Sequence, residues 1–114
     1  MALTDKTYQP VQQLTIEAIE DLLPFRFVSH LGSLCAADSK AFGVTETDWL
    51  SGEKAAVVTL GTIPIATTTS VNIGDDITSD TDGKAKTITG SEPVNGRAMD
   101  STTGAGIIRM KIVP

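Results

Sequence analysis

The sequence predicts an all-β protein: a small β-barrel or sandwich-like domain of short strands, preceded by an N-terminal extended arm and a short helix. Two observations carry this prediction. From Phe25 onward, glycines recur at spacings of roughly 6–13 residues and separate short runs of Val, Ile, Ala and Thr, which is typical of turns between strands. Residues 1–23 contain no glycine, so the composition changes at Pro24. We therefore expect an arm and helix over residues 1–24 and a β-barrel-like domain over residues 25–114.

The N-terminal part is expected to begin as an extended arm and to continue as a helix. Residues 1–14 show no clean periodicity, and Pro10 favours extended backbone. Residues 15–23 fit a short amphipathic helix that Pro24 ends, because their apolar side chains share one face of a helix. A helix this short is unstable alone in water, so it must pack on something. The expected apolar face consists of Ile16, Ile19 and Leu23.

Eight short strands are expected after Pro24. The run 55–60 lacks an alternation of apolar and polar residues, which indicates a strand covered on both faces. Asp82-Gly83 between two β-runs is a strong signal for a hairpin turn. The last strand has an apolar face of Ile108, Met110 and Ile112 and a basic face of Arg109 and Lys111. The expected strands are residues 25–30, 33–37, 54–60, 62–67, 76–79, 85–88, 94–98 and 106–113.

Length, charge and side-chain inventory exclude several classes of function. The 114 residues suit one domain with a single core. There are 14 acidic and 9 basic residues, and the net charge of −5 disfavours nucleic acid as a partner. We expect no membrane association, because no apolar run reaches the length of a spanning helix. We expect synthesis in the cytoplasm, because the polar N-terminus is unlike a signal peptide. Cys35 has no disulfide partner and suits a small buried hydrophobic residue.

One acidic segment resembles a calcium-binding loop but has a simpler interpretation. Asp80 and Asp82 precede Gly83 at the spacing of EF-hand ligands, yet Thr78 and Thr89 occupy the first and last ligand positions. Two anchoring carboxylates are therefore missing. A solvated hairpin turn is favoured over a metal site.

The remaining motifs indicate no cofactor and no catalytic centre. Lys111 lies inside a strand rather than at an exposed tip, so it does not suit a carrier lysine. Gly104-Ala-Gly106 lacks the spacing of a phosphate-binding loop. His30 is the only histidine, and no nucleophile elbow is present. Trp49 suits two roles equally, an aromatic anchor at an interface or a plug at one end of the barrel.

Short motifs follow one another in a fixed order over residues 18–113. They are Ala18-Ile-Glu-Asp-Leu-Leu, Phe25-Arg-Phe-Val28, Ala36-Ala-Asp38, Phe42-Gly-Val44-Thr-Glu-Thr47, Ser51-Gly-Glu53, Val57-Val-Thr-Leu-Gly61, Ile73-Gly-Asp75, Ser79-Asp80, Asp82-Gly-Lys-Ala85, Val94-Asn-Gly-Arg-Ala98 and Gly104-Ala-Gly106. This order resembles the small capsid cement, or head decoration, proteins of tailed bacteriophages. The resemblance implies a β-barrel-like domain, often trimeric, on the outside of a capsid, without enzyme activity or cofactor. After Asp100, Ser-Thr-Thr replaces the Ala-rich stretch of the commoner pattern.

We therefore expect a capsid decoration protein, made in the bacterial host cytoplasm, that binds the outer surface of the virion head and stabilises the capsid lattice against the pressure of packaged DNA. Its expected partners are the major capsid protein and further copies of itself in a homotrimer. The alternative is another virion structural module, such as a tail or fibre component, and a small hydrolase that uses His30 ranks third. The residues expected to contact the capsid or a neighbouring subunit are Tyr8, Pro10, Val11, Leu14, Ile16, Ile19 and Trp49.

Overall fold

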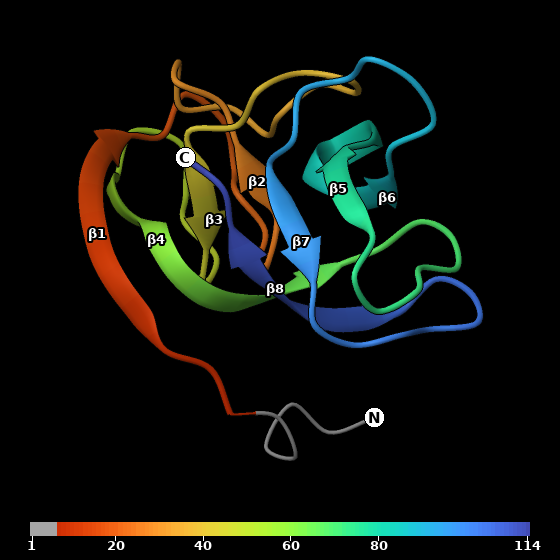
Figure 1. Ribbon diagram of the computed structural model, residues 1–114. Coiled ribbons are helices and arrows are strands. Elements are labelled where there is room, and N and C mark those ends of the chain that lie inside the picture. The colour runs from red at the N-terminus through yellow and green to blue at the C-terminus, as the bar shows by residue number, and fades with distance from the viewer. Residues whose placement is uncertain (1–6) are drawn as a thin grey trace.

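The computed structural model describes residues 7–114, which form a strongly bent sheet with long connecting loops (Figure 1). A single helical turn, η2 (Thr81–Gly83), accompanies the strands in this part of the chain. The strands are β1 (Pro10–Glu17), β2 (Phe27–Val28), β3 (Gly43–Thr45), β4 (Lys54–Ala66), β5 (Asp76–Ser79), β6 (Ala85–Thr87), β7 (Gly96–Ala98) and β8 (Ile107–Ile112). The predicted all-β fold class is confirmed.

The sheet nearly closes into a barrel. Its strand order is β2-β3-β4-β8-β7-β5-β6, and β1 pairs with β4 beside this path. A parallel bridge between Thr67 and Ala85 joins the end of β4 to β6, and Thr68 donates a main-chain hydrogen bond to the Ala85 carbonyl at 3.0 Å. The β6 end of the path therefore meets the end of β4, the longest strand.

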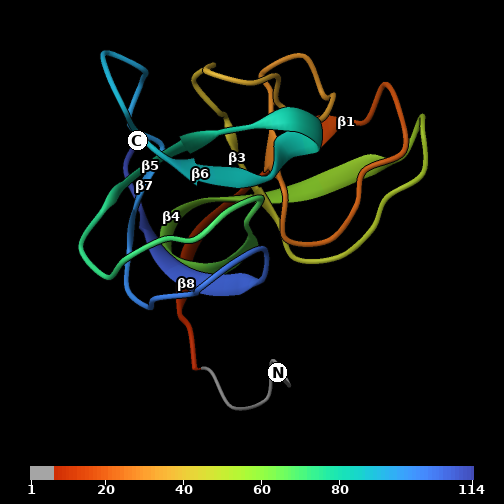
Figure 2. The same ribbon diagram turned by 90° about the vertical axis from the view of Figure 1, so that its right-hand side faces the viewer.

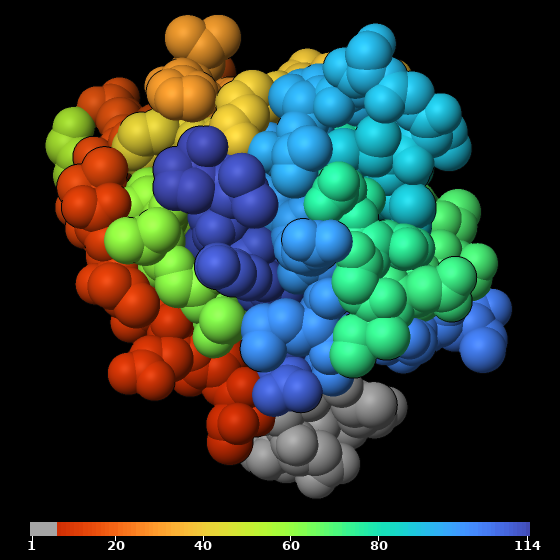
Figure 3. Space-filling view, viewed as in Figure 1, coloured from red at the N-terminus to blue at the C-terminus, as the bar shows by residue number. Residues whose placement is uncertain are grey.

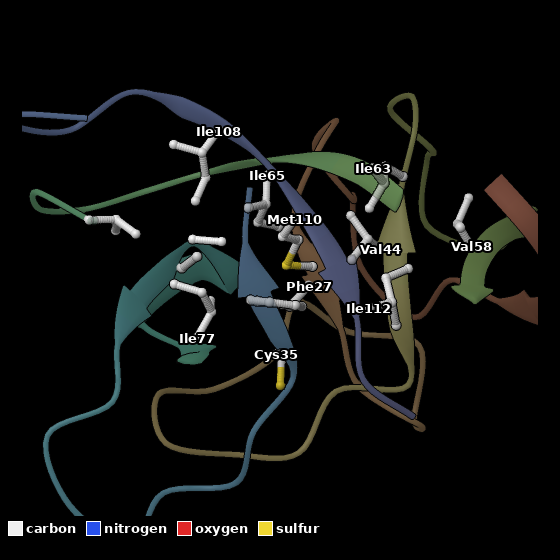
Figure 4. Packing of buried hydrophobic residues seen from close by; sticks show 13 residues of the cluster. Phe27, Cys35, Val44, Val58, Ile63, Ile65, Ile77, Ile108, Met110 and Ile112 are labelled. Atoms are coloured by element: carbon white, nitrogen blue, oxygen red, sulfur yellow. The ribbon is translucent and has the colours of Figure 1, made fainter. Parts of the chain in front are cut away.

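Strand β4 separates two hydrophobic clusters. Val58 is fully buried in the larger cluster, which fills the barrel and contains Phe27, Ile63 and Met110 (Figure 4). Val57, the next residue along the strand, is fully buried in a smaller cluster on the other face. Neighbouring residues of a strand point to opposite faces, so both faces of β4 are covered here, as the sequence predicted. The smaller cluster consists of Ala18, Leu22, Val28, Ala55 and Val57, with Ile16, Leu34, Phe42 and Trp49 packed against it.

The prediction of a helix over residues 15–23 is wrong. Strand β1 runs through Glu17 and pairs in antiparallel register with β4, and residues 18–23 form an irregular loop. Ile19 and Leu23 of the expected apolar face are 57% and 43% exposed, whereas Leu22 is buried. The edge of β4 offers a continuous row of hydrogen-bonding partners, and this outweighs the weak tendency of a nine-residue segment to form a helix. The first six residues of the expected arm lie outside the described residues, and the segment from Pro10 is extended as predicted.

Several strand boundaries also differ from the prediction. Residues 54–60 and 62–67 were expected as two strands, but β4 continues without interruption through Gly61. The expected strand 33–37 contributes one isolated bridge, between Leu34 and Val28, and β1 and β3 were not predicted. In contrast, β5 has the predicted bounds, the Asp82-Gly83 hairpin joins β5 to β6, and the apolar face of β8 is buried as expected.

Candidate functional site

Strand β1 lies at the edge of the sheet. Val57 of β4 pairs with Leu14 of β1 on one side and with Thr45 of β3 on the other, so β1 and β3 flank β4. Within residues 7–114, β4 is the strand that pairs with β1, and no strand covers the outer edge of β1. Figure 3 shows this strand along one margin of the molecule. Its side chains Val11 and Leu14 are 66% and 43% exposed. An exposed edge strand with apolar side chains is a surface that native proteins normally cover.

The start of β1 is held in place by side chains from distant strands and loops. The phenol ring of Tyr8 packs edge-on against Phe25, with ring centroids 6.5 Å apart. Its hydroxyl donates a 3.1 Å hydrogen bond to Glu46, which also accepts from the Gln13 side-chain amide at 2.5 Å. Partial burial, followed by the effect of Glu46, raises the pKa of Tyr8 above its ordinary value. The guanidinium of Arg109 donates to the Thr7 carbonyl at 3.1 Å. The direction in which β1 enters the sheet is therefore fixed.

A shallow groove of about 380 Å³ lies beside β1. Leu14 of β1 and Leu60 of β4 line one part of it, and Phe42 and His30 line another. The imidazole of His30 packs edge-on against the Phe42 ring at 5.0 Å. At one margin, the Lys40 ammonium donates to the carbonyls of Val94 and Val113 at 2.6 and 2.8 Å, and partial burial lowers its pKa. The groove is lined mainly by apolar side chains, and Leu60 is 39% exposed.

The predicted contact residues are distributed between this edge and the loop that follows it. Val11 and Leu14 are exposed on β1, and Ile19 is exposed on the loop. Ile16 is half-buried because it packs on the smaller cluster, and Trp49 packs there too instead of at an end of the barrel core. Tyr8 and Pro10 are half-buried at the start of the strand. Leu60, Phe42 and His30 join the same surface from remote segments, and no local motif in the sequence signals this.

The family is decided by a comparison with models of known protein families. The model for phage cement proteins matches residues 8–112, from the start of β1 to the end of β8. The chain belongs to the phage cement protein family. This membership makes it a structural protein of the phage particle that decorates the capsid. The comparison with curated proteins gave no match.

One solved phage structure resembles the fold of this cement protein. The chain resembles the N base of head fiber gp8.5 in bacteriophage phi29, with a TM-score of 0.74 and 18% identity. The alignment covers 90% of this chain and 93% of that one. At 18% identity, the likeness shows a shared fold and nothing more.

The other motifs of this cement protein have structural roles in the described residues. Asp80 accepts from the Thr81 N–H at 2.8 Å and from the Thr68 hydroxyl at 2.6 Å, and these contacts hold the β5–β6 hairpin. The Thr68 hydrogen bond is the main cause that lowers the pKa of Asp80. No group of three or more His, Cys, Asp or Glu side chains within residues 7–114 is placed to hold a metal ion. Cys35 is buried in the barrel core, and burial raises the pKa of its thiol.

None of the helical segments in the described part of the chain has the length and apolar character needed to cross a membrane.

Proposed function

We propose that this cement protein binds the outer surface of the phage head as a homotrimer, with the major capsid protein as its partner, and reinforces the lattice against the pressure of packaged DNA. The observation that carries the proposal is the family match, which spans every strand of the barrel. A reinforcing protein must transmit force without deforming. The buried clusters on both faces of β4 and the near closure of the sheet supply that rigidity.

We assign the contacts between copies, or between a copy and the shell, to the edge strand β1 and the residues around it. The edge of β1 is unpaired, and the side chains of Val11 and Leu14 are exposed. Contact with another protein is favourable here because it removes apolar surface from water and covers the open edge. The groove beside Leu14 extends the same apolar surface. A trimer multiplies each weak contact with the shell, because the second and third contacts form at a high effective concentration. The full set proposed for contact is Tyr8, Pro10, Val11, Leu14, Ile16, Ile19 and Trp49.

The acidic character of the chain supports a location outside the shell. A net charge of −5 repels nucleic acid, and a protein on the outer surface does not meet the packaged genome. Reinforcement then acts only through contacts with protein. We also infer that the chain has no catalytic role. His30→Ala should remain folded, and because His30 lines the groove beside Leu14, an effect on capsid binding would reflect that contact surface.

The direct test is to add the purified protein to heads that lack it and to measure the temperature at which the heads release their DNA. We expect binding at a defined copy number and a higher release temperature. Heads that bind the protein but rupture at the same temperature would contradict a reinforcing role. Failure to bind mature heads at all would overturn the proposal.

The mass of the protein in solution and on the head tests the trimer separately. Val11→Asp with Leu14→Asp places two charges on the exposed side chains of β1, where neither replacement disturbs a buried core. We expect the double variant to remain folded and to lose the trimer or the capsid affinity. The charge-matched control is Thr69→Asp with Thr103→Asp, on exposed residues of two other loops. An equal trimer mass and an equal affinity in both variants would refute the assignment of β1.

A second candidate function is the base of a head fibre, because the fold resembles the N base of head fiber gp8.5 in bacteriophage phi29. If the chain is a fibre base, each copy on the head should carry a projecting module, whereas a decoration protein should repeat over the lattice without one. Electron microscopy of labelled particles separates the two by copy number and position. A few labelled sites per head, each carrying a projecting module, would favour the fibre base.

A further inference from the structure

Three loops lie side by side at one end of the molecule, residues 18–23, 29–34 and 47–53 (Figure 2). We call their combined surface the acidic end. Main-chain hydrogen bonds of 2.6–3.0 Å connect the loops, from Ala18 to Glu53, from Gly52 to Ala18, from Ile19 to Gly32 and in both directions between Leu22 and Trp49. Backbone bonding in several places gives these loops a defined relative position. A preformed surface loses little conformational entropy when it binds a partner.

Large apolar side chains are exposed on each of these loops. Leu31 is 76% exposed, Leu50 64% and Ile19 57%. Leu23, which ends the first loop, is 43% exposed. Single exposed apolar residues are common, but several of them at one end of a small domain indicate an interface.

Carboxylates surround these apolar side chains and are held by main-chain N–H groups. Glu20 accepts from Leu34 at 2.9 Å, Asp21 from Ser51 at 2.9 Å and Glu53 from Leu50 at 2.6 Å. Residues 17–23 and 47–54 together carry five carboxylates and one lysine, a net charge of −4, and the whole chain carries −5. Almost all of the excess negative charge is therefore gathered where the apolar side chains are exposed.

A buried donor at the same end lacks an acceptor. The indole N–H of Trp49, which packs on the smaller cluster beneath these loops, is buried and has no hydrogen-bond partner among the described residues. Buried donors are nearly always paired in native proteins. Arg26 Nε and Thr78 Oγ1 are also buried without a partner among the described residues, so the indole is an unmet donor beneath the loops and not by itself a sign of a docked molecule.

A basic surface of this chain lies at the opposite end and does not serve as the partner. Arg97 of β7 is paired directly opposite Lys111 of β8, next to the exposed Ile73, but the Asp76 carboxylate of β5 lies 4.0 Å from the Arg97 guanidinium and offsets part of this positive charge. Figure 2 shows β7 on the left and the loops of the acidic end on the right. Copies joined acidic end to basic end would therefore grow as an open chain, whereas the proposed trimer is closed. The complementary surface belongs to a different protein.

We propose that the acidic end docks on the shell of the head, and that the shell presents Lys and Arg side chains there around an apolar depression. This inference rests on the proposed function, which supplies the shell as the partner. Complementary charge orients the encounter, and the buried Leu and Ile side chains supply the affinity. The edge strand β1 then remains available for contacts between copies.

The experiment compares two neutralised variants on heads that lack the protein. Glu20→Gln, Asp21→Asn and Glu53→Gln together remove three charges from the acidic end, and each new amide oxygen still accepts the existing main-chain hydrogen bond. The control combines Asp38→Asn, Asp76→Asn and Asp82→Asn, which removes three charges elsewhere. Binding of each variant is titrated at low and at high salt. A third variant, Leu50→Ser, removes an exposed apolar side chain without changing the charge.

We expect the acidic-end triple variant to bind at least about tenfold more weakly than the control and to show a smaller salt dependence. Leu50→Ser should also weaken binding, with the salt dependence of the wild-type protein. Equal affinities of the two triple variants would overturn the inference, as would a changed trimer mass with unchanged affinity for heads. If the wild-type protein itself does not bind heads, the proposed function fails first. The two failures are therefore distinguishable.

Discussion

Gly61 sits where β4 exchanges one partner strand for another, and replacing it with alanine tests how β1 is held. Gly61 pairs with Pro10 of β1, and the next residue, Thr62, pairs with Lys111 of β8. The Gly61 φ angle of +111° lies in a region that L-residues rarely adopt. A Cβ atom placed there would meet the Gln9 carbonyl oxygen and would lie 2.7 Å from the Val11 nitrogen. Both are backbone atoms, so relief requires β1 to move.

Two further glycines separate the two penalties in Gly61→Ala. Gly52 has a φ of +92° with nothing within 4 Å of the added Cβ, so Gly52→Ala measures backbone strain alone, about 1–3 kcal/mol. Gly43 has no positive φ, but its Cβ would lie 2.5 Å from the Val58 carbonyl oxygen, so Gly43→Ala measures crowding alone. Gly61→Ala combines both effects. We expect it to lower the free energy of unfolding by about 3 kcal/mol or more, at the upper end of single-residue effects.

Urea denaturation followed by the fluorescence of Trp49, the single tryptophan, gives the three free energies of unfolding. Hydrogen exchange locates the effect, because Thr62 donates to the Gln9 carbonyl at 3.0 Å and the displacement of β1 would break this bond. We expect the Thr62 amide to lose protection in Gly61→Ala and to keep it in Gly52→Ala. Equal destabilisation by Gly61→Ala and Gly52→Ala, with Thr62 still protected, would refute the reasoning.

Three further predictions concern the barrel and its hairpin. Ile108→Ala empties a fully buried position and should lower the free energy of unfolding by about 2–5 kcal/mol, measured by urea denaturation. Thr68→Val removes the hydrogen bond that keeps the pKa of Asp80 low. The stability that this bond gives the folded protein is present above the unfolded-state pKa of Asp80 and is lost as the pH falls through the lower folded-state pKa. The variant should therefore be less stable than wild type at neutral pH, by a difference that shrinks in acid, and an acid-independent difference would contradict the assignment. The Arg109 guanidinium is held by two 3.0 Å hydrogen bonds to Asp100 and donates to the Thr7 carbonyl just before β1. Arg109→Gln removes these bonds and should increase hydrogen exchange at the start of β1, whereas unchanged exchange would show that other contacts hold this segment.

The structure agrees best with the sequence where one segment contains its own evidence. The alternation in β8 puts Ile108, Met110 and Ile112 in the core, because a strand repeats every two residues whatever lies next to it. The continuous apolar run in β4 required cover on both faces, and two clusters provide it. The Asp82-Gly83 hairpin forms because both residues tolerate the positive φ angles of 57° and 74° that the turn uses.

The prediction failed where the outcome depended on a distant partner. The apolar spacing of residues 15–23 fits a helix as well as a strand that continues into a loop, and the free edge of β4 decided between them. Strand β3 has three residues, which is too short to show a period, and it exists because Val44 pairs with both Phe27 and Val58. The groove could not be predicted from the sequence either, because Leu14, Phe42 and Leu60 come together only when β1, β3 and β4 are assembled.

The sequence by itself determined the fold class, the acidic balance, the scarcity of reactive side chains and the family resemblance, since each of these is a property of composition or of local pattern. Only the tertiary structure decided which surfaces are available for contact. Edge or interior position, exposure of an apolar side chain and the gathering of charge at one end all depend on which segments become neighbours. The sequence predicted residues 10–14 as extended and residues 15–17 as the start of a helix. Strand β1 is a candidate interface because no other described strand covers its outer edge.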